Sequence, residues 1–332
     1  MMEHNIILIG CGEHSLESLI PSLAAIPSVN VTTLCDIDVA NLNKAKAWFP
    51  SAKNISKDKY SSDDLSGHSA VVIAGPPQLH ETISRIAIAQ KIPVFVEKPP
   101  TTYTYGLKEL AEMATKNQVV TCVGHNLRHS DAAHEFNKTI TDKKFGKPVA
   151  MEMRYMASKP RGTRWGLESP LRSFLLSHAN HAIDLMIYQM GKIKHTVAAR
   201  VWPDVNGGVA ITAQFIFESG AVGNLLASSY APYFQVSSSV LSDKGCIAEM
   251  NGLHEVVMKG DPDLGKRWYK QWKPRTLETG FRFAGYQTEL EVFFCAIEAA
   301  SNNLNLVHPS FQDEVEIYEA MDAIEKSIND NH

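Results

Sequence analysis

Two histidines and an aspartate lie close together in the stretch FLLSHANHAIDLM, residues 174–186, where His178, His181 and Asp184 follow one another at intervals of three. An imidazole can ligate a metal ion, and it can also exchange a proton with a substrate because its ordinary pKa is about 6.5. A third interpretation is a buried helix whose polar side chains are hydrogen-bonded inside the fold. The surroundings of the stretch decide among these three.

Helix geometry disfavours a metal site here. On a helix, the side chains of His178 and Asp184 point about 120° from each other, so they do not converge on one ion. The chain also contains no HExxH motif and no CxxC pair. We therefore expect no metal, which leaves proton transfer and a purely structural role as the two interpretations.

A glycine turn near the N-terminus is a candidate cofactor site. In IILIGCGEHSLES, Gly10 and Gly12 end a β-branched run and Ser15 opens a stretch of helical spacing. Glycines at such a point let the backbone approach a pyrophosphate at a helix N-terminus, where free amide groups favour an anion. Glu13 and His14 complete the turn and are less usual beside phosphates.

An acid at the end of the next predicted strand indicates which cofactor to expect. Asp36 follows Gly12 at close to the roughly 20 residues typical of an acid that accepts hydrogen bonds from the adenosine ribose. Its charge would repel a 2′-phosphate, and no arginine follows in DIDVANLNK. The sequence therefore favours NAD over NADP.

A lysine follows another predicted strand. Glu97, Lys98 and Pro99 stand at the end of the apolar run 92–97, and the carboxyl ends of parallel strands are where open α/β sheets bind ligands. A lysine there can donate to a substrate oxygen on which negative charge develops. Lys98 is therefore the second candidate catalytic residue, beside His181.

The first third of the chain must position these residues on one sheet. Short β-branched runs alternate with stretches of helical spacing, which is typical of a parallel sheet covered on both faces. Strands are predicted at 5–10, 29–36, 69–75, 92–97 and 118–125, and a helix at 104–116. We expect a Rossmann dinucleotide-binding domain, a doubly wound parallel sheet, over residues 1–124.

From about residue 148 the spacing changes to period two. The runs 148–157, 195–202, 208–230, 234–250 and 254–260 alternate apolar and polar residues, with turns at Ser219-Gly220 and Lys244-Gly245. The helix at 174–190 is inserted between the first two strands, and helices at 285–300 and 311–328 follow. The sequence predicts a second, α+β domain over residues 125–332, with an open, mostly antiparallel sheet.

The chain as a whole resembles the glucose-fructose oxidoreductase / inositol dehydrogenase (Gfo/Idh/MocA) family. The stretches that carry the resemblance are GCGEHS, CDID, GPPQLH, EKPP, GHNLRH, FGKPV, HAIDLMIYQMG and SFQDEVEIYEA. The resemblance implies an NAD-dependent dehydrogenase acting on CH–OH groups of a sugar, sugar derivative or cyclitol. It implies that Lys98 lies between nicotinamide and substrate, that His181 is the acid/base, and that Gly75, Pro76 and His80 belong to a turn lining the cofactor.

Residues on the substrate side are expected from the same stretches and their surroundings. Asn126 and Arg128 match a family stretch near the active site, and Tyr155 lies on the first strand of the second sheet. The loop before the His181 helix carries Lys159, Arg161, Arg164 and Arg172, together with Trp165, a candidate stacking wall. Such a loop suits an anionic substrate, although a solvated loop is an equal alternative. His178 and Asp184 complete the expected substrate-binding residues.

Position 177 departs from the family pattern. The family's sugar and inositol dehydrogenases usually carry an aspartate four residues before the histidine, and here the residue is Ser177. A neutral hydroxyl cannot stabilise an imidazolium as a carboxylate does, which leaves His178 and Asp184 as candidates to complete the relay. Two alternatives therefore stay open: a catalytically inactive NAD-binding sensor of the same fold, and an NAD-dependent glycosidase. An imine or tetrapyrrole reductase is disfavoured by Asp36.

Composition narrows the partners. The chain has 332 residues, 44% hydrophobic and 20% charged, with a net charge of -4, which predicts no general attraction for nucleic acid or an anionic membrane. The N-terminus is neither a signal peptide nor a membrane span in pattern, and the five scattered cysteines fit a reducing compartment. We expect a cytoplasmic protein that binds a small molecule and forms a homodimer or homotetramer through the second sheet.

Overall fold

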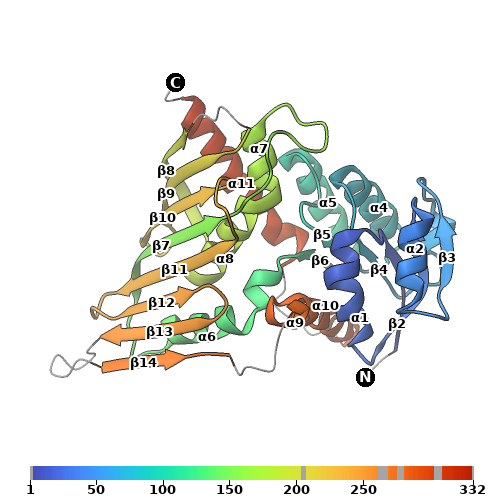
Figure 1. Cartoon of the computed structure of the whole chain (residues 1–332), viewed down its shortest axis with the longest axis horizontal. Helices are drawn as coiled ribbons and strands as arrows, with labels where there is room; N and C mark the ends of the chain where they lie inside the picture. The colour runs from blue at the N-terminus through green and yellow to red at the C-terminus, as the bar shows by residue number, and fades with distance from the viewer. Residues whose placement is uncertain (1–2, 203–206, 261–267, 275–279, 303–308, 331–332) are drawn as a thin grey trace. The chain divides into compact units, whose positions relative to one another are not determined.

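The computed structural model describes residues 3–202, 207–260, 268–274, 280–302 and 309–330. The chain divides into two compact units, one of Met1–Asn126 with Thr279–Val315 and the other of Leu127–Glu278 with Glu316–His332. Figure 1 shows both units with most of their helices and strands labelled.

The first unit is built on a parallel sheet with strand order β3-β2-β1-β4-β5-β6. Its strands are β1 His4–Ile9, β2 Val29–Asp36, β3 Lys53–Ser56, β4 Ala70–Ile73, β5 Val94–Glu97 and β6 Thr121–Gly124. Every residue of β4, β5 and β6 is buried, as expected for strands covered on both faces. The predicted Rossmann sheet is confirmed, and β3, a short strand at its edge, was not predicted.

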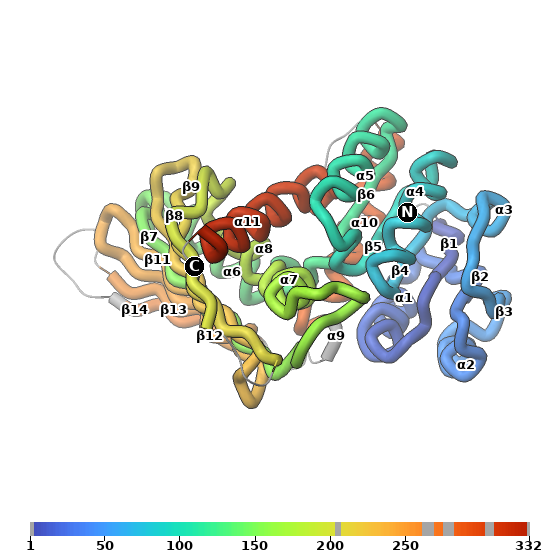
Figure 2. Tube along the Cα trace, turned by 90° about the horizontal axis from the view of Figure 1, so that it is seen from above, coloured from blue at the N-terminus to red at the C-terminus, as the bar shows by residue number. Residues whose placement is uncertain are grey.

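Helices cover both faces of this sheet. They are α1 Ile20–Ala24, preceded by a π-helical turn at Ser15–Leu19, then α2 Val39–Lys46, α3 Ser62–Leu65, α4 Pro77–Ala89, α5 Thr104–Asn117, α9 Gly280–Phe283 and α10 Tyr286–Ser301. In Figure 2, α4 and α5 lie on the side of the sheet opposite to α1. This is the doubly wound arrangement that the alternating pattern predicts.

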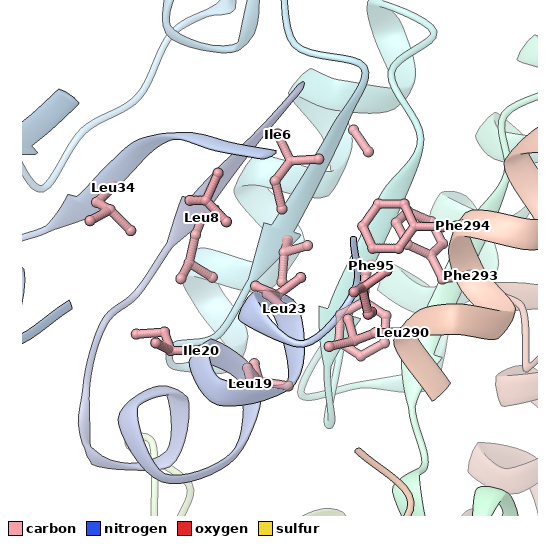
Figure 3. Packing of buried hydrophobic residues seen from close by; sticks show 14 of the residues in the cluster. Ile6, Leu8, Leu19, Ile20, Leu23, Leu34, Phe95, Leu290, Phe293 and Phe294 are labelled. Carbon is pink, nitrogen blue, oxygen red and sulfur yellow. The ribbon is translucent and has the colours of Figure 1, made fainter. Parts of the chain in front are cut away.

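Helix α10 joins the first unit although it follows the second sheet in the chain. Phe293 has no exposed surface, and its ring lies 5.8 Å from that of Phe95 on β5. Leu290 and Phe294 pack into the same cluster with β1 and α1 (Figure 3). From the sequence, residues 279–315 are predicted to belong to the second domain, because they follow the second sheet in the chain. In the structure they belong to the first unit, because the apolar face of α10 is buried there.

The second unit contains a sheet of order β14-β13-β12-β11-β7-β10-β9-β8. Its strands are β7 Pro148–Met156, β8 Ile193–Trp202, β9 Ala210–Phe217, β10 Val222–Ser228, β11 Gln235–Ser242, β12 Ile247–Asn251, β13 Glu255–Gly260 and β14 Trp268–Trp272. β7 and β10 pair in parallel and the other neighbours are antiparallel. The predicted mostly antiparallel sheet is confirmed.

One face of this sheet packs on helices. Along β9, Ile211, Ala213 and Phe215 are buried while Thr212 and Gln214 alternate with them on the exposed face. The helices are α6 Asp131–Thr141, after a short 3-10 turn at Asn126–His129, then α7 Pro170–Phe174, a π-helical turn at Leu175–Ala179, α8 Asn180–Met190 and α11 Phe311–Asn329, which begins in the first unit. Figure 2 shows α6, α8 and α11 on the same side of the sheet.

Candidate active site

The glycine turn after β1 has the geometry of a ligand-binding turn. Gly10 has φ +95°, and a Cβ there would stand 1.7 Å from the Ala74 carbonyl oxygen, so only glycine fits. A Cβ on Gly12, in contrast, would meet no atom of the described residues within 4 Å. Ser15 holds the turn by donating its hydroxyl to the Gly10 carbonyl at 2.7 Å. Open space over Gly12, at the start of a helix, suits the close approach of a pyrophosphate.

Asp36 is joined to this turn. Its Oδ2 accepts the Cys11 N–H at 2.6 Å and its Oδ1 accepts the Asp38 N–H at 2.8 Å. Each carboxylate oxygen keeps a further lone pair, so both can still accept from ribose hydroxyls. The neighbouring Ile37 is 71% exposed and offers apolar surface beside the acid. These residues fit the adenosine end of NAD.

His80 joins the two segments expected to line the cofactor. Its Nε2 accepts the Gly75 N–H at 2.7 Å, and its Nδ1–H donates to the Pro99 carbonyl at 2.9 Å. This pair of partners requires the neutral imidazole. Burial of the fully enclosed ring lowers the pKa of His80 to about 4. His80 therefore holds the Gly75-Pro76 turn against the EKPP loop.

Glu97 forms an ion pair with the glycine turn. Its Oε1 lies 3.0 Å from His14 Nε2, and its Oε2 accepts the Lys98 N–H at 3.2 Å. The charge of Glu97 raises the pKa of His14 above its ordinary value. Burial acts most strongly on Glu97 and raises its pKa, but the charge and hydrogen bond of His14 together with the charge of Lys98 outweigh it, so the pKa is lowered. Glu97 thus favours the protonated form of His14, at a position that is unusual beside phosphates.

The helix that carries His181 contains a π-helical turn immediately before that residue. α7 starts at Pro170 with Ser169 as its N-cap, the π turn covers Leu175–Ala179, and α8 ends at Met190 with Gly191 as its C-cap. Within the turn, Ser177 donates its hydroxyl to the Ser173 carbonyl at 2.6 Å, and His178 Nδ1 lies 2.9 Å from the Ser177 hydroxyl oxygen. π turns inside helices are rare and frequently occur at functional sites. The hydrophobic periodicity of the sequence could not reveal this π turn, because a π turn shifts the helical repeat by only one residue.

Asp184 and Arg128 bind each other. Arg128 Nε donates to Asp184 Oδ2 at 2.9 Å, and a second Arg128 nitrogen donates to the other carboxylate oxygen. Asp184 has no exposed surface, and the Arg128 guanidinium also lies over the Tyr188 ring at 5.3 Å. Asn126, in the first unit, donates to the Ala284 carbonyl at 2.8 Å. The carboxylate considered as a helper for His181 is therefore neutralised by an arginine.

Tyr155 and His181 lie together beneath an exposed aromatic. The Tyr155 ring is nearly parallel to that of His181, at 6.3 Å and 17°, and its centroid is 6.4 Å from that of His178. On the other side, Phe234 meets Tyr155 edge to face at 5.4 Å. Phe234 is not among the residues expected from the sequence. In the sequence it is marked by the aromatic residues of the turn APYF, residues 231–234, between two strands.

The basic loop is only partly available to a ligand. Arg172 is buried and donates to Asp322 at 2.8 Å and to Glu325 at 3.0 Å, both on α11. Arg161 and Arg164 are exposed and lie over the rings of Tyr230, at 4.7 Å, and Trp165, at 5.5 Å. The charge of Arg172 is therefore already matched by two carboxylates, whereas Arg161 and Arg164 remain exposed.

Family models match both units of the chain. The model of the oxidoreductase family with an NAD-binding Rossmann fold matches residues 4–125, and the GFO/IDH/MocA C-terminal domain matches residues 134–248. This chain belongs to the Gfo/Idh/MocA family. Its first unit is an NAD-binding Rossmann domain, and the chain is an NAD-binding oxidoreductase.

Solved structures of this family share the whole architecture. A dehydrogenase from Chromobacterium violaceum is 28% identical, with a TM-score of 0.91 over 100% of this chain and 96% of that one. An oxidoreductase from Agrobacterium radiobacter in complex with NAD+, L-tartaric acid and magnesium is 16% identical, with a TM-score of 0.83 over 100% and 98%. Levoglucosan dehydrogenase in complex with NADH and levoglucosan is 19% identical, with a TM-score of 0.84 over 100% and 98%. A comparison with curated protein sequences found no significant match.

Two further observations concern metals and membranes. Among the residues that the structure describes, no three histidine, cysteine, aspartate or glutamate side chains are arranged to hold a metal ion. None of the described helices combines the length and apolar character needed to cross a bilayer.

Proposed function

We propose that this chain is an NAD-dependent dehydrogenase that interconverts an alcohol and a carbonyl group on a sugar, sugar derivative or cyclitol. The observation that carries the proposal is His181: a nearly buried imidazole on a π-turned helix, stacked with Tyr155, in a chain whose first unit binds NAD. The nicotinamide of NAD, when bound, supplies the hydride acceptor or donor.

The first unit holds the cofactor through its backbone and one acid. Gly10, Gly12 and the first amides of the following helix would receive the pyrophosphate, and Asp36 the adenosine ribose. Gly75, Pro76 and Glu97 would line the cofactor on the segments that His80 ties together. Glu13 and His14 belong to the same turn and would lie close to the pyrophosphate.

Two side chains handle the substrate hydroxyl. As the carbinol is oxidised, its C–H bond breaks with loss of a hydride, its O–H proton passes to His181, and the oxygen becomes a carbonyl. Lys98 donates to that oxygen and stabilises its developing negative charge. Asp184, three residues after His181 on the same helix, is paired with Arg128.

The remaining substrate-side residues orient the molecule. Tyr155 and His178 form the surroundings of His181, while the Arg128-Asp184 pair fixes the helix face from which these side chains project. Arg164, with Trp165 beneath it, would contact an anionic substituent if the substrate carries one.

The test is NADH formation from NAD+ with a panel of sugars, sugar acids and cyclitols. His181→Asn and Lys98→Ala should each reduce kcat by roughly 100-fold or more, as expected for loss of an acid/base or an electrostatic stabiliser, while NAD affinity is kept. His195→Asn, at an exposed histidine of the second unit, and the exposed Lys116→Ala are matched controls expected to lose less than tenfold. Unchanged turnover in His181→Asn would overturn the role of that residue.

A second candidate is an NAD-binding sensor that has lost turnover, and Ser177 in place of a carboxylate favours it. It predicts NAD binding without NADH formation across the whole panel. An NAD-dependent glycosidase predicts instead cleavage of a glycosidic bond with no net NADH.

We also propose that the exposed face of the second sheet contacts another copy of this chain. Val222, Leu226, Leu241 and Ile247, on β10, β11 and β12, are each at least 36% exposed. Leu226 also lines a hollow of about 780 Å³ together with Glu152, Arg154 and Glu249. Apolar side chains with both signs of charge suit a self-complementary interface. Leu226→Arg should reduce the mass measured by light scattering to that of a smaller assembly, with Tyr105→Arg, at an exposed aromatic of the first unit, as the control.

A further inference from the structure

The pairing of the strands arranges the exposed residues of the second sheet in rows that run across it. Residues opposite each other on paired strands point to the same face, and so do residues two positions apart along one strand. One row, which we call the acidic row, contains Glu249, Ser239, Glu152 and Asn224. The next row, which we call the basic row, contains Arg154, Leu226, Thr212 and Arg200. Together these two rows line the hollow of about 780 Å³ on this face.

A further row flanks each of the charged rows, and we call these the first and second apolar rows. The first lies beside the acidic row, has three side chains that are 37% to 50% exposed, and contains Ile247, Leu241, Ala150 and Val222. The second lies beside the basic row and contains Met156, Ser228, Ala210 and Trp202. Trp202 is 72% exposed. Along the strands, the exposed face therefore runs from apolar to acidic, then to basic and again to apolar.

Glu152 and Arg154 carry unmatched charges near the middle of this face. They lie two residues apart on β7, and both are exposed. β7 is an inner strand, with β11 on one side and β10 on the other (Figure 1). Glu249, in the acidic row, is matched by Lys259 at 2.6 Å. Neither Glu152 nor Arg154 forms an ion pair within the part of the chain that the structure describes, so both charges can meet a partner.

The order of the rows decides which orientation of a second copy fits. When two identical sheets pack face to face with aligned strands, the two-fold axis lies between them and runs either along the strands or across them. An axis along the strands places each row opposite itself, so that Glu152 meets Glu152 of the partner subunit. An axis across the strands, between the two charged rows, places the acidic row opposite the basic row and the first apolar row opposite the second. Like charges in contact disfavour a complex and opposite charges favour it, so the row order fits the axis across the strands.

We propose that Glu152 and Arg154 set the orientation of a second copy of this chain, with a two-fold axis that crosses the strands between the acidic and basic rows. This inference rests on the proposed contact between copies and adds the side chains that direct it. Arg154 then pairs with Glu152 of the partner subunit, and because the interface is the same on both copies, the pair is made twice. The first apolar row covers the second apolar row of the partner subunit, which removes apolar side chains of both copies from water.

The experiment exchanges the two charges in the full chain. Light scattering and sedimentation over a range of protein concentrations give the dissociation constant between copies for the wild type, Glu152→Arg, Arg154→Glu and the double variant. An equimolar mixture of the two single variants is measured as well. Glu112→Arg and Lys116→Glu, at exposed positions of α5 in the first unit, are the matched controls. The melting temperature should change little in every variant, because the substituted side chains are exposed.

We expect each single variant to separate the copies. Glu152→Arg places an arginine opposite Arg154 of the partner subunit at both pairs, so the dissociation constant should rise about tenfold or more, and Arg154→Glu should act likewise with two carboxylates. In the double variant every arginine again meets a glutamate, which should restore the wild-type dissociation constant to within about threefold. The mixture should associate as tightly, because one variant then offers only arginines at these two positions and the other only glutamates.

A neutral substitution distinguishes the two axes. Glu152→Gln removes an attraction and should weaken association about two- to tenfold. An axis along the strands predicts the opposite, because the same substitution then removes a repulsion between like charges. Tighter association of Glu152→Gln, or a mixture of the single variants that stays apart, would overturn the proposed pairing.

The contact between copies and the pairing that orients it fail in different ways. Separation of the copies by Leu226→Arg but not by Glu152→Arg would keep the contact and reject the pairing. A wild-type chain that remains a single copy at every concentration would reject both, whether or not it forms NADH.

Discussion

His80 links two segments of the NAD-binding unit through both nitrogens of one buried ring, accepting from the Gly75 N–H and donating to the Pro99 carbonyl. Gly75 follows β4 and Pro99 follows β5, so a single side chain sets the spacing of two adjacent strand ends. Only the neutral imidazole satisfies both partners, which makes this link sensitive to pH.

The pKa of His80, about 4 in the folded protein against about 6.5 unfolded, predicts acid destabilisation. Because the folded value is the lower one, the stability contribution is complete above about pH 6.5 and is lost as the pH falls toward 4. The total is about 3 kcal/mol, or about 1.4 kcal/mol per pH unit in that window. In urea unfolding, the stability difference between wild type and His80→Ala should therefore be about 2 kcal/mol smaller at pH 5 than at pH 7. Parallel pH curves for the two proteins would contradict this, and exposed His195→Ala is the control.

The two glycines of the cofactor turn should respond differently to the same added methyl group. Gly10→Ala places a Cβ against the Ala74 carbonyl and should destabilise the first unit severely, whereas Gly12→Ala adds a methyl where no described atom lies within 4 Å. Gly12→Ala should keep the melting temperature within a few degrees and weaken NAD binding by about tenfold or more, because the methyl occupies the space of the pyrophosphate. Melting curves and NAD titrations measure the two effects. Unchanged NAD affinity in Gly12→Ala would show that the cofactor lies elsewhere.

The His14–Glu97 pair should make a small contribution to the free energy of unfolding, and this contribution should depend on pH. The pKa of His14 is raised, so its contribution is present below about pH 6.5 and lost as the pH rises through the raised value. The pKa of Glu97 is lowered, so its contribution is lost as the pH falls through that lowered value. The His14 side chain is 46% exposed, and solvent screening limits the pair to about 1 kcal/mol or less.

His14→Gln should therefore lose stability mainly in mildly acidic solution, and less in high salt than in low salt. Melting temperatures across pH at two salt concentrations test this, with His195→Gln as the control. A deficit that grows as the pH rises above 8 would have the wrong sign.

Breaking the buried pair on the His181 helix should be costly. Asp184 has no exposed surface and the Arg128 side chain is 11% exposed, so removing either partner takes the opposite charge of this pair away from a group that is largely shielded from water. Asp184→Asn and Arg128→Met should each lower the free energy of unfolding by about 3–5 kcal/mol, and the double variant by less than the sum. The exposed Lys192–Glu316 pair is the control, where Lys192→Ala should cost less than about 1 kcal/mol. Additive losses in the double variant would show that the two charges are not coupled.

Local pattern was enough to predict the glycine turn and the strands of both sheets except the edge strands β3 and β14. A buried parallel strand is a run of apolar residues, and Gly10 is required by its positive φ and by the Ala74 carbonyl, so both features are determined by a few neighbouring residues. The same is true of the helix that carries His181 and of the period-two strands of the second sheet. The place of Asp36 beside the glycine turn follows from the same local pattern, because the turn ends β1 and Asp36 ends β2, the next strand in the βαβ unit.

Partners distant in the chain were beyond the reach of periodicity. Arg128 meets Asp184, Arg172 meets Asp322 and Glu325, and α10 returns to the first sheet after the whole of the second. Which opposite charge a buried arginine finds depends on how the elements pack, because any of several carboxylates satisfies the sequence pattern equally well. Packing likewise directs Phe234 against Tyr155, although nothing in its own neighbourhood in the chain indicates His181.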